Sequence, residues 1–111
     1  MPDNGDVWNF YGRTLIELKR LPEAVTALRK TTTLPLYATP DIAYSNLGYA
    51  LQLLGDHAGA LRAYQEAIKI DPPTVPRALL YLEVGRLYVA QGESAKAREA
   101  LAQVKLLDPQ G

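Results

Sequence analysis

The chain has 111 residues, the size of one ordinary domain, and 48% of them are hydrophobic and 22% charged, a composition typical of a folded soluble protein. Twelve basic residues balance twelve acidic ones, so the chain has no overall field that would attract nucleic acid or an anionic membrane. The absence of cysteine excludes disulfides and thiolate sites, and it fits a cytoplasmic as well as a periplasmic location. No apolar run is long enough for a signal peptide or a membrane span, so we expect no insertion of this segment into a bilayer.

A first pair of helices is predicted at the N-terminal end. From Asp6 to Lys19, apolar or small residues recur at helical intervals and form an inner stripe of Trp8, Tyr11, Gly12 and Leu15. The partner helix is predicted to begin near Pro22, a residue favoured in the first turn, and to carry inward Ala24, Leu28 and Thr31. The turn between the two helices falls at Lys19-Arg20.

The stretch 41–72 has the most regular pattern. Two amphipathic helices are separated by a tight turn at Gly55-Asp56, and the second helix stops before Pro72. Their stripes contain Tyr44, Leu47, Gly48 and Leu51, and then Ala60, Tyr64 and Ala67. We expect the small residues Gly48 and Ala60 to let the two helix backbones approach each other closely.

A third pair of helices is predicted from Pro76 to Gln91 and from Ser94 to Asp108, with Gly92-Glu93 as the turn between them. Ser94 is expected to cap the start of the last helix through its side chain. The inner stripes of this pair contain Tyr81, Val84, Gly85 and Tyr88, and then Ala97, Leu101 and Val104.

The three pairs repeat along the sequence. Small residues of the inner stripes keep the same two intervals, 36 and then 37 residues: Gly12, Gly48 and Gly85, and also Ala24, Ala60 and Ala97. The connections 34–40 and 72–76 are bounded by prolines and cannot continue a helix. This periodicity predicts three helical hairpins that stack on one another.

The order of residues in 41–72, from the aromatic and Leu-Gly positions through Gly-Asp to Asp-Pro, resembles a tetratricopeptide repeat (TPR). The resemblance implies an all-α fold, a right-handed superhelix of three helix-turn-helix hairpins with six helices. The repeats would span roughly 5–36, 41–72 and 78–109, as one domain that belongs to a longer protein.

No catalytic or metal-binding pattern is present in the sequence. His57 is the only histidine, and it has no second ligand at a spacing that would hold a metal. The glycine-containing turn at 55–59 lacks the Lys-Ser/Thr of a phosphate-binding loop. We therefore predict a protein that is not an enzyme and needs neither cofactor nor metal. Core packing rather than base stacking is expected for Tyr11, Tyr44, Tyr64, Tyr81 and Tyr88.

The TPR resemblance also implies a site, because the first helices of such repeats line a concave groove that holds an extended peptide or a helix of a partner protein. Carried over position by position, the groove residues are Asn9, Arg13, Ile42, Ser45, Tyr49, Gln52, Leu79, Leu82 and Arg86. Members that clamp a terminal carboxylate use basic residues at places where this chain has Leu79 and Glu83. That mode of binding is therefore not expected here.

A narrower resemblance points to one group within the family. The segments 36–48, 8–12 and 19–24 resemble the bacterial TPR lipoproteins, called pilotins, that help assemble the outer-membrane secretin of type IV pili. This resemblance implies a periplasmic adaptor, anchored at the outer membrane, that escorts a secretin subunit. The lipid-bearing cysteine and the additional repeats of that group are missing from this sequence.

An alternative function concerns the C-terminal end of the predicted stack. The sequence ends without the polar-faced helix that usually closes such arrays, so we expect partial exposure of Leu101, Val104 and Leu107. Either the segment was excised from a longer protein, or this surface mediates self-association, for example as a homodimer.

Overall fold

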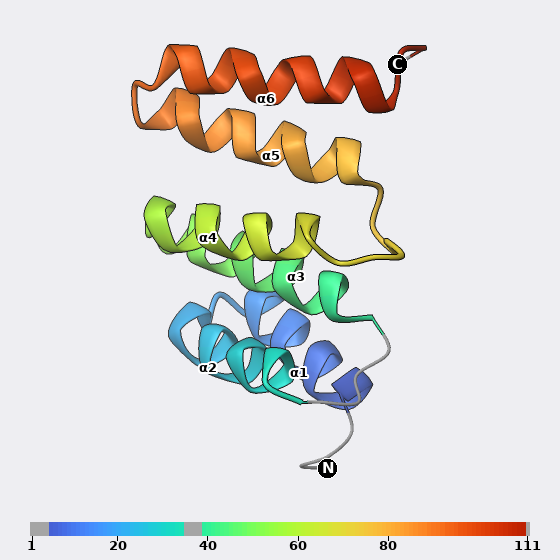
Figure 1. The fold of residues 1–111 in the computed structure, drawn as a ribbon. Helices are drawn as coiled ribbons and strands as arrows, with labels where there is room; N and C mark the ends of the chain where they lie inside the picture. Colours follow the sequence, from blue (N-terminus) through green and yellow to red (C-terminus); the bar gives the residue numbers. More distant parts are fainter. Residues whose placement is uncertain (1–4, 35–38, 111) are drawn as a thin grey trace.

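The computed structural model describes residues 5–34 and 39–110, which form six α-helices and no strand (Figure 1). The predicted connection 34–40 lies largely outside the described residues. The helices are α1 (Gly5–Glu17), α2 (Leu21–Thr32), α3 (Pro40–Leu53), α4 (His57–Ile68), α5 (Arg77–Ala90) and α6 (Ser94–Leu107).

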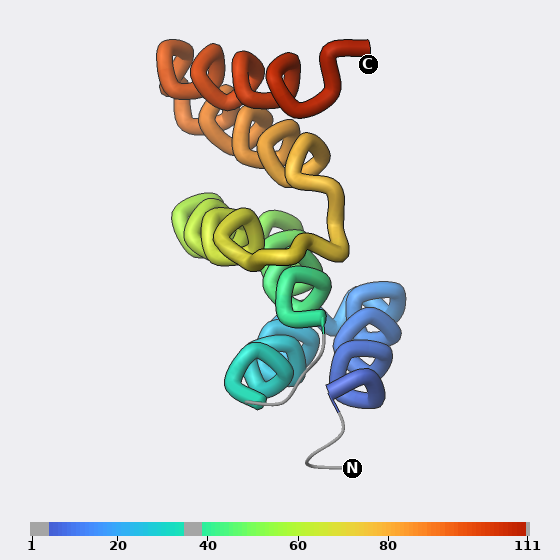
Figure 2. The backbone as a smooth tube through the Cα atoms, turned by 45° about the vertical axis from the view of Figure 1, so that its right-hand side comes forward, coloured from blue at the N-terminus to red at the C-terminus, as the bar shows by residue number. Residues whose placement is uncertain are grey.

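The helices form three antiparallel hairpins, α1 with α2, α3 with α4, and α5 with α6. The second helix of each hairpin packs against the first helix of the next, so α2 contacts α3 and α4 contacts α5. Figure 2 shows each hairpin turned relative to the one before it, with the two termini at opposite ends of the stack. The predicted fold class, an all-α superhelix of three helical hairpins, is confirmed.

The turn inside each hairpin has the same geometry. A residue in the left-handed region ends the first helix: Lys19 with φ 64°, Gly55 with φ 86° and Gly92 with φ 77°. The next backbone N–H then donates to a carbonyl five residues back, from Arg20 to Leu15 at 2.9 Å and at the equivalent places in the other two turns. This is the Schellman motif. The Lys19-Arg20 turn, which departs from the Gly-Asp pattern in sequence, therefore does not depart from it in structure.

Because lysine is strained at positive φ, we expect Lys19→Gly to raise the free energy of unfolding by about 0.5 to 1 kcal/mol. The gain is smaller than the whole strain energy of a left-handed lysine, since glycine also has more conformational freedom in the unfolded chain. Urea unfolding followed by circular dichroism measures this difference. The matched change in the next hairpin is Gly55→Ala, which places a Cβ in the same conformation and is expected to lower stability by about 1 kcal/mol. A Lys19→Gly variant that is less stable than the original chain would contradict the strain argument.

Small residues sit where each hairpin closes. Gly12 is covered by the side chain of Leu28, and Gly48 by the ring of Tyr64. A Cβ on Gly48 would lie only 2.9 Å from the ring carbon Cε2 of Tyr64. The absent side chain of Gly48 therefore makes room for the ring of Tyr64. The close approach of the two helix backbones at Gly48 and Ala60 stays a prediction.

Three expectations about the helix ends and the core are wrong. Helix α1 stops at Glu17 rather than Lys19, since Lys19 has left the helical conformation. Ser94 is the first residue of α6 and provides no cap, because the N-cap position is occupied by Glu93. Tyr11 is 46% exposed rather than buried, because no hairpin precedes α1 within the described residues.

Candidate peptide-binding groove

A pocket of about 390 Å³ lies between α3 and α5, with one residue of α4 as part of its wall. It brings together six of the nine predicted groove residues: Ser45, Tyr49, Gln52, Leu79, Leu82 and Arg86. Four further residues line it that the sequence did not single out for the groove: Tyr64, Val75, Leu80 and Glu83. We refer to this pocket as the α3–α5 groove.

Apolar surface faces solvent on both walls of the α3–α5 groove. Tyr49 of α3 is 49% exposed, and Leu79 of α5 is 55% exposed. Leu82, one turn along α5, is half-buried. Exposed apolar side chains that gather at one concavity are typical of a contact surface, whereas isolated ones are not.

The polar groups of the groove are partly paired with one another. The Tyr64 hydroxyl donates to Oε1 of Gln52 at 3.3 Å, and Arg86 forms an ion pair with Glu83 at 2.9 Å. Burial raises the pKa of Tyr64, and the negative charge of Glu83 adds to this shift, so the hydroxyl stays protonated and remains a donor. The Glu83–Arg86 pair leaves the rim of the groove close to neutral.

Three predicted groove residues lie elsewhere. Asn9 is buried, and its Oδ1 accepts a hydrogen bond of 2.9 Å from Asn46, which joins α1 to α3. The prediction that Asn9 meets a ligand is therefore wrong. Arg13 is exposed on α1 and Ile42 is half-buried near the start of α3, and neither lines the α3–α5 groove.

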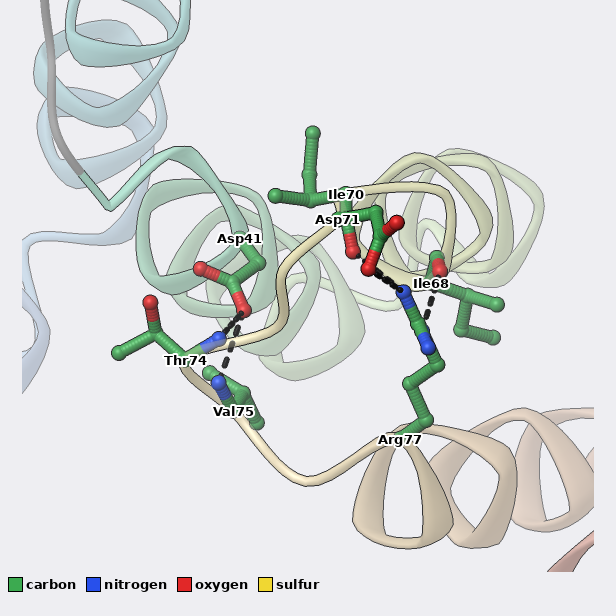
Figure 3. A network of polar contacts seen from close by, with 7 residues as sticks. All are labelled: Asp41, Ile68, Ile70, Asp71, Thr74, Val75 and Arg77. Atoms are coloured by element: carbon green, nitrogen blue, oxygen red, sulfur yellow. Dashed lines mark hydrogen bonds and ion pairs between the residues drawn. The ribbon is translucent and has the colours of Figure 1, made fainter.

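The connection between α4 and α5 sets the position of one groove wall, and Asp41 holds it in place (Figure 3). The Asp41 side chain is fully buried, and its Oδ2 accepts hydrogen bonds from the backbone N–H groups of Thr74, at 2.6 Å, and Val75, at 2.8 Å. The other residues of 72–76 are prolines, which have no N–H. Asp41 at the start of α3 thus pairs with every backbone donor that this stretch possesses.

Arg77 holds the same connection from the other side. Its guanidinium donates to the carbonyl oxygens of Ile68 at 3.0 Å and Ile70 at 2.8 Å, and it reaches the carboxylate of Asp71 at 3.3 Å (Figure 3). These carbonyls come at the end of α4, where helix acceptors lack partners within the helix. The first turn of α5 is therefore tied to the last turn of α4, while Asp41 ties the connection to α3.

A second pocket, of about 460 Å³, lies on the opposite face of α5 between α4 and α6. Two of its polar side chains contact Tyr88, whose hydroxyl accepts from Gln65 at 3.5 Å and whose ring lies 5.8 Å from Nζ of Lys96. This pocket is larger than the α3–α5 groove, but it offers less exposed apolar surface to a partner.

The described residues were also searched for metal and membrane features. Within 5–34 and 39–110, no three His, Cys, Asp or Glu side chains are grouped so that they could hold a metal ion. None of the helices in that part of the chain combines the length and the apolar character that crossing a membrane requires.

The stacked hairpins and the groove along their first helices define a helical-repeat scaffold. Family models described as tetratricopeptide repeat match residues 42–72 and 78–110, which together make up more than half of the chain. The protein belongs to the tetratricopeptide repeat family. The first hairpin lies outside both matches, yet it has the same turn and the same period.

Solved structures with this fold come from several proteins. The crystal structure of MamA is 28% identical with a TM-score of 0.83, and the match covers 97% of this chain and 60% of MamA. PilW, described as a widely conserved type IV pilus biogenesis factor, is 23% identical with a TM-score of 0.84 over 96% of this chain and 47% of PilW. PilF of Pseudomonas aeruginosa is 26% identical with a TM-score of 0.77 over 92% of this chain and 46% of PilF.

The chain thus spans between 46% and 60% of the length of these structures. A search of curated protein sequences finds no relative that matches the chain.

Proposed function

We propose that the protein is a non-catalytic interaction scaffold whose α3–α5 groove binds an extended peptide or a helix of a partner protein. The observation that carries this proposal is the apolar surface of Tyr49 and Leu79, each about half exposed on facing walls of one pocket. Removing such surface from water is the main source of binding free energy in helix and peptide grooves.

The groove favours a particular kind of ligand. An apolar side chain of the partner would enter between Tyr49 and Leu82, where its surface is removed from water. The Gln52 carbonyl accepts from Tyr64, which leaves its amide N–H groups for a peptide carbonyl. The partner segment is therefore expected to be apolar rather than strongly charged.

For the partner itself, we propose a component of type IV pilus assembly, with the secretin subunit as the first candidate. The support is the resemblance of residues 36–48 to the pilus-assembly lipoproteins and the similarity of the fold to PilW. In this role the chain would act as an adaptor that holds a segment of the subunit while the pore assembles.

The test uses fluorescent peptides tiled across a type IV pilus secretin subunit, with binding followed by fluorescence anisotropy. Tyr49→Ala is expected to weaken the binding peptide about tenfold, because a central aromatic contact is lost. The matched control is Tyr11→Ala, which removes a tyrosine of similar exposure, 46% against 49%, outside the groove. That variant is expected to bind normally.

A second substitution and a second ligand set separate the two parts of the proposal. Leu82→Asp places a charge on the apolar wall and is expected to abolish binding, whereas Leu106→Asp on α6 should leave it unchanged. Binding that is insensitive to both Tyr49→Ala and Leu82→Asp would contradict the groove. If secretin peptides fail but peptides from a random library bind through Tyr49 and Leu82, the pilus role is rejected and the groove is retained.

A further inference from the structure

A third pocket, of about 270 Å³, lies between the second helices of the first two hairpins. Arg29 lines it from α2 and Arg62 from α4, and Tyr44 and Leu51 of the intervening helix α3 also contribute to its lining. Described helices bound this pocket on both sides. We refer to it as the α2–α4 furrow.

The two arginines of the α2–α4 furrow are not neutralised. Neither Arg29 nor Arg62 forms an ion pair with any described residue. Glu66 also lines the furrow, but its Oε1 is paired with Nζ of Lys69 at 3.3 Å. Two like charges at one concavity repel each other, whereas an anion bound between them removes this repulsion and accepts hydrogen bonds from both guanidinium groups.

The internal repeat shows that the helices can pack in this way without the two arginines. The pocket between α4 and α6 is the equivalent of the α2–α4 furrow one hairpin later. Its residues Gln65 and Glu99 stand 36 residues after Arg29 and 37 residues after Arg62. An amide and a carboxylate therefore occupy the two positions there, so the fold itself does not require a positive charge at either of them.

The charge of the second helices favours an acidic ligand. Helices α2, α4 and α6 contain six basic and three acidic residues, whereas α1, α3 and α5 contain three basic and four acidic residues. The chain is neutral overall, so its positive charge is concentrated on the helices that form the walls of the furrow. Such a charge distribution attracts acidic segments to this surface and repels basic ones.

We propose that the α2–α4 furrow binds an acidic segment of a partner protein, with an Asp or Glu side chain of that segment between Arg29 and Arg62. The furrow uses Tyr44 and Leu51 of α3, whereas the α3–α5 groove uses Ser45 and Tyr49, so the two sites lie on different faces of this helix. The proposal therefore does not depend on ligand binding in the groove.

Two other anions fit the furrow less well than a protein carboxylate. Phosphate sites at helix ends use free backbone N–H groups, but the N–H of Gly59 in this pocket already donates to Oδ1 of Asp56 at 2.9 Å. Binding to an anionic membrane is usually accompanied by insertion of apolar side chains. Neither α2 nor α4 has an exposed large hydrophobic residue that could insert.

The test uses a fluorescein-labelled peptide in which Asp and Glu alternate with Gly and Ser, with binding followed by fluorescence anisotropy. Arg29→Gln and Arg62→Gln are each expected to weaken binding about tenfold, because one charged donor group is lost. Arg62→Glu introduces the residue of the equivalent pocket and is expected to abolish binding. A peptide with Asn and Gln in place of Asp and Glu should not bind.

Arg98→Gln is the matched control. Arg98 is exposed on α6 and lines neither the α2–α4 furrow nor the pocket between α4 and α6, so this change removes the same charge elsewhere on the second helices. The variant is expected to bind the acidic peptide normally, and so is Tyr49→Ala, which alters only the α3–α5 groove. Circular dichroism should show that all variants are folded.

Several results would overturn the proposal. They are the absence of binding to the acidic peptide at about 1 mM, equal binding of the Asn and Gln peptide, and a loss in Arg98→Gln as large as that in Arg62→Gln. Inorganic phosphate that displaces the peptide at concentrations at which glutarate does not would identify a phosphate site instead. Cosedimentation with vesicles that contain phosphatidylglycerol, if Arg62→Gln abolishes it, would identify a membrane instead.

Discussion

Asp41→Ala is expected to lower the free energy of unfolding by about 3 kcal/mol, because two backbone donors lose a fully buried acceptor. The N–H groups of Thr74 and Val75 both donate to Oδ2 of Asp41. Asp41 is the one side chain that the described structure gives these two N–H groups as an acceptor. Urea denaturation measures the difference, with the same dependence of the unfolding free energy on urea concentration used for both proteins.

Two further variants calibrate this result. Asp41→Asn keeps one acceptor oxygen without the charge and is expected to cost about half as much. Asp56→Ala removes a carboxylate that caps α4 by accepting from the N–H of Gly59 at 2.9 Å. This exposed cap should cost about 1 kcal/mol. If Asp41→Ala costs no more than Asp56→Ala, the buried carboxylate does not hold the connection.

Gly12→Ala is expected to lower stability by about 2 kcal/mol. A Cβ at Gly12 would lie 2.6 Å from both Cγ and Cδ2 of Leu28, and Leu28 is fully buried with no space to withdraw. The overpacking cost of up to about 3 kcal/mol exceeds the gain of about 1 kcal/mol that alanine brings to a helix. Thermal and urea unfolding of the variant measure the net effect.

The same substitution at the equivalent position of the third hairpin should have the opposite sign. At Gly85 the atoms nearest to a Cβ are Ala100 Cβ and Leu101 Cδ2, both at 3.7 Å, an ordinary contact distance. Gly85→Ala is therefore expected to raise stability by about 0.5 kcal/mol through helix propensity alone. Equal effects at Gly12 and Gly85 would contradict the view that local space decides the outcome.

The architecture could be predicted from the sequence because the signal is repeated. The intervals of 36 and 37 residues place Gly12, Gly48 and Gly85 at one structural position, and the turns at Lys19, Gly55 and Gly92 keep the same period. Lys19 shows how strongly the repeat constrains the backbone, since a lysine adopts a conformation that favours glycine. Local propensity at that residue alone would not have predicted the turn.

The groove could be predicted only in part. Register along the repeat places Tyr49 and Arg86, which are 37 residues apart, on one surface, because residues at the same repeat position of neighbouring hairpins face the same way. The same register failed for the groove residue Asn9, and the burial predicted for the core residue Tyr11 failed as well. The Asn9 side chain is buried and accepts a hydrogen bond from Asn46. Tyr11 is exposed because its burial requires a hairpin that packs against α1. The burial of each of these two side chains depends on which helices pack beside it, and the position of a residue within one repeat does not specify those neighbours.

The anchoring role of Asp41 was not predictable, since an aspartate near a helix start is ordinarily a residue of the solvated first turn. Its burial depends on the path of a connection that lies 33 residues further along the chain, at Thr74. The available signal was the proline content of 72–76, which leaves only two backbone donors in that stretch.

The central claim is that a partner segment binds in the α3–α5 groove, and an NMR titration of the isotope-labelled chain with a bound peptide tests it most directly. We expect the amide signals of Ser45, Tyr49, Leu79 and Leu82 to shift together and saturably. Shifts that instead gather at Gln65, Lys69 and Lys96, in the larger pocket between α4 and α6, would contradict the account.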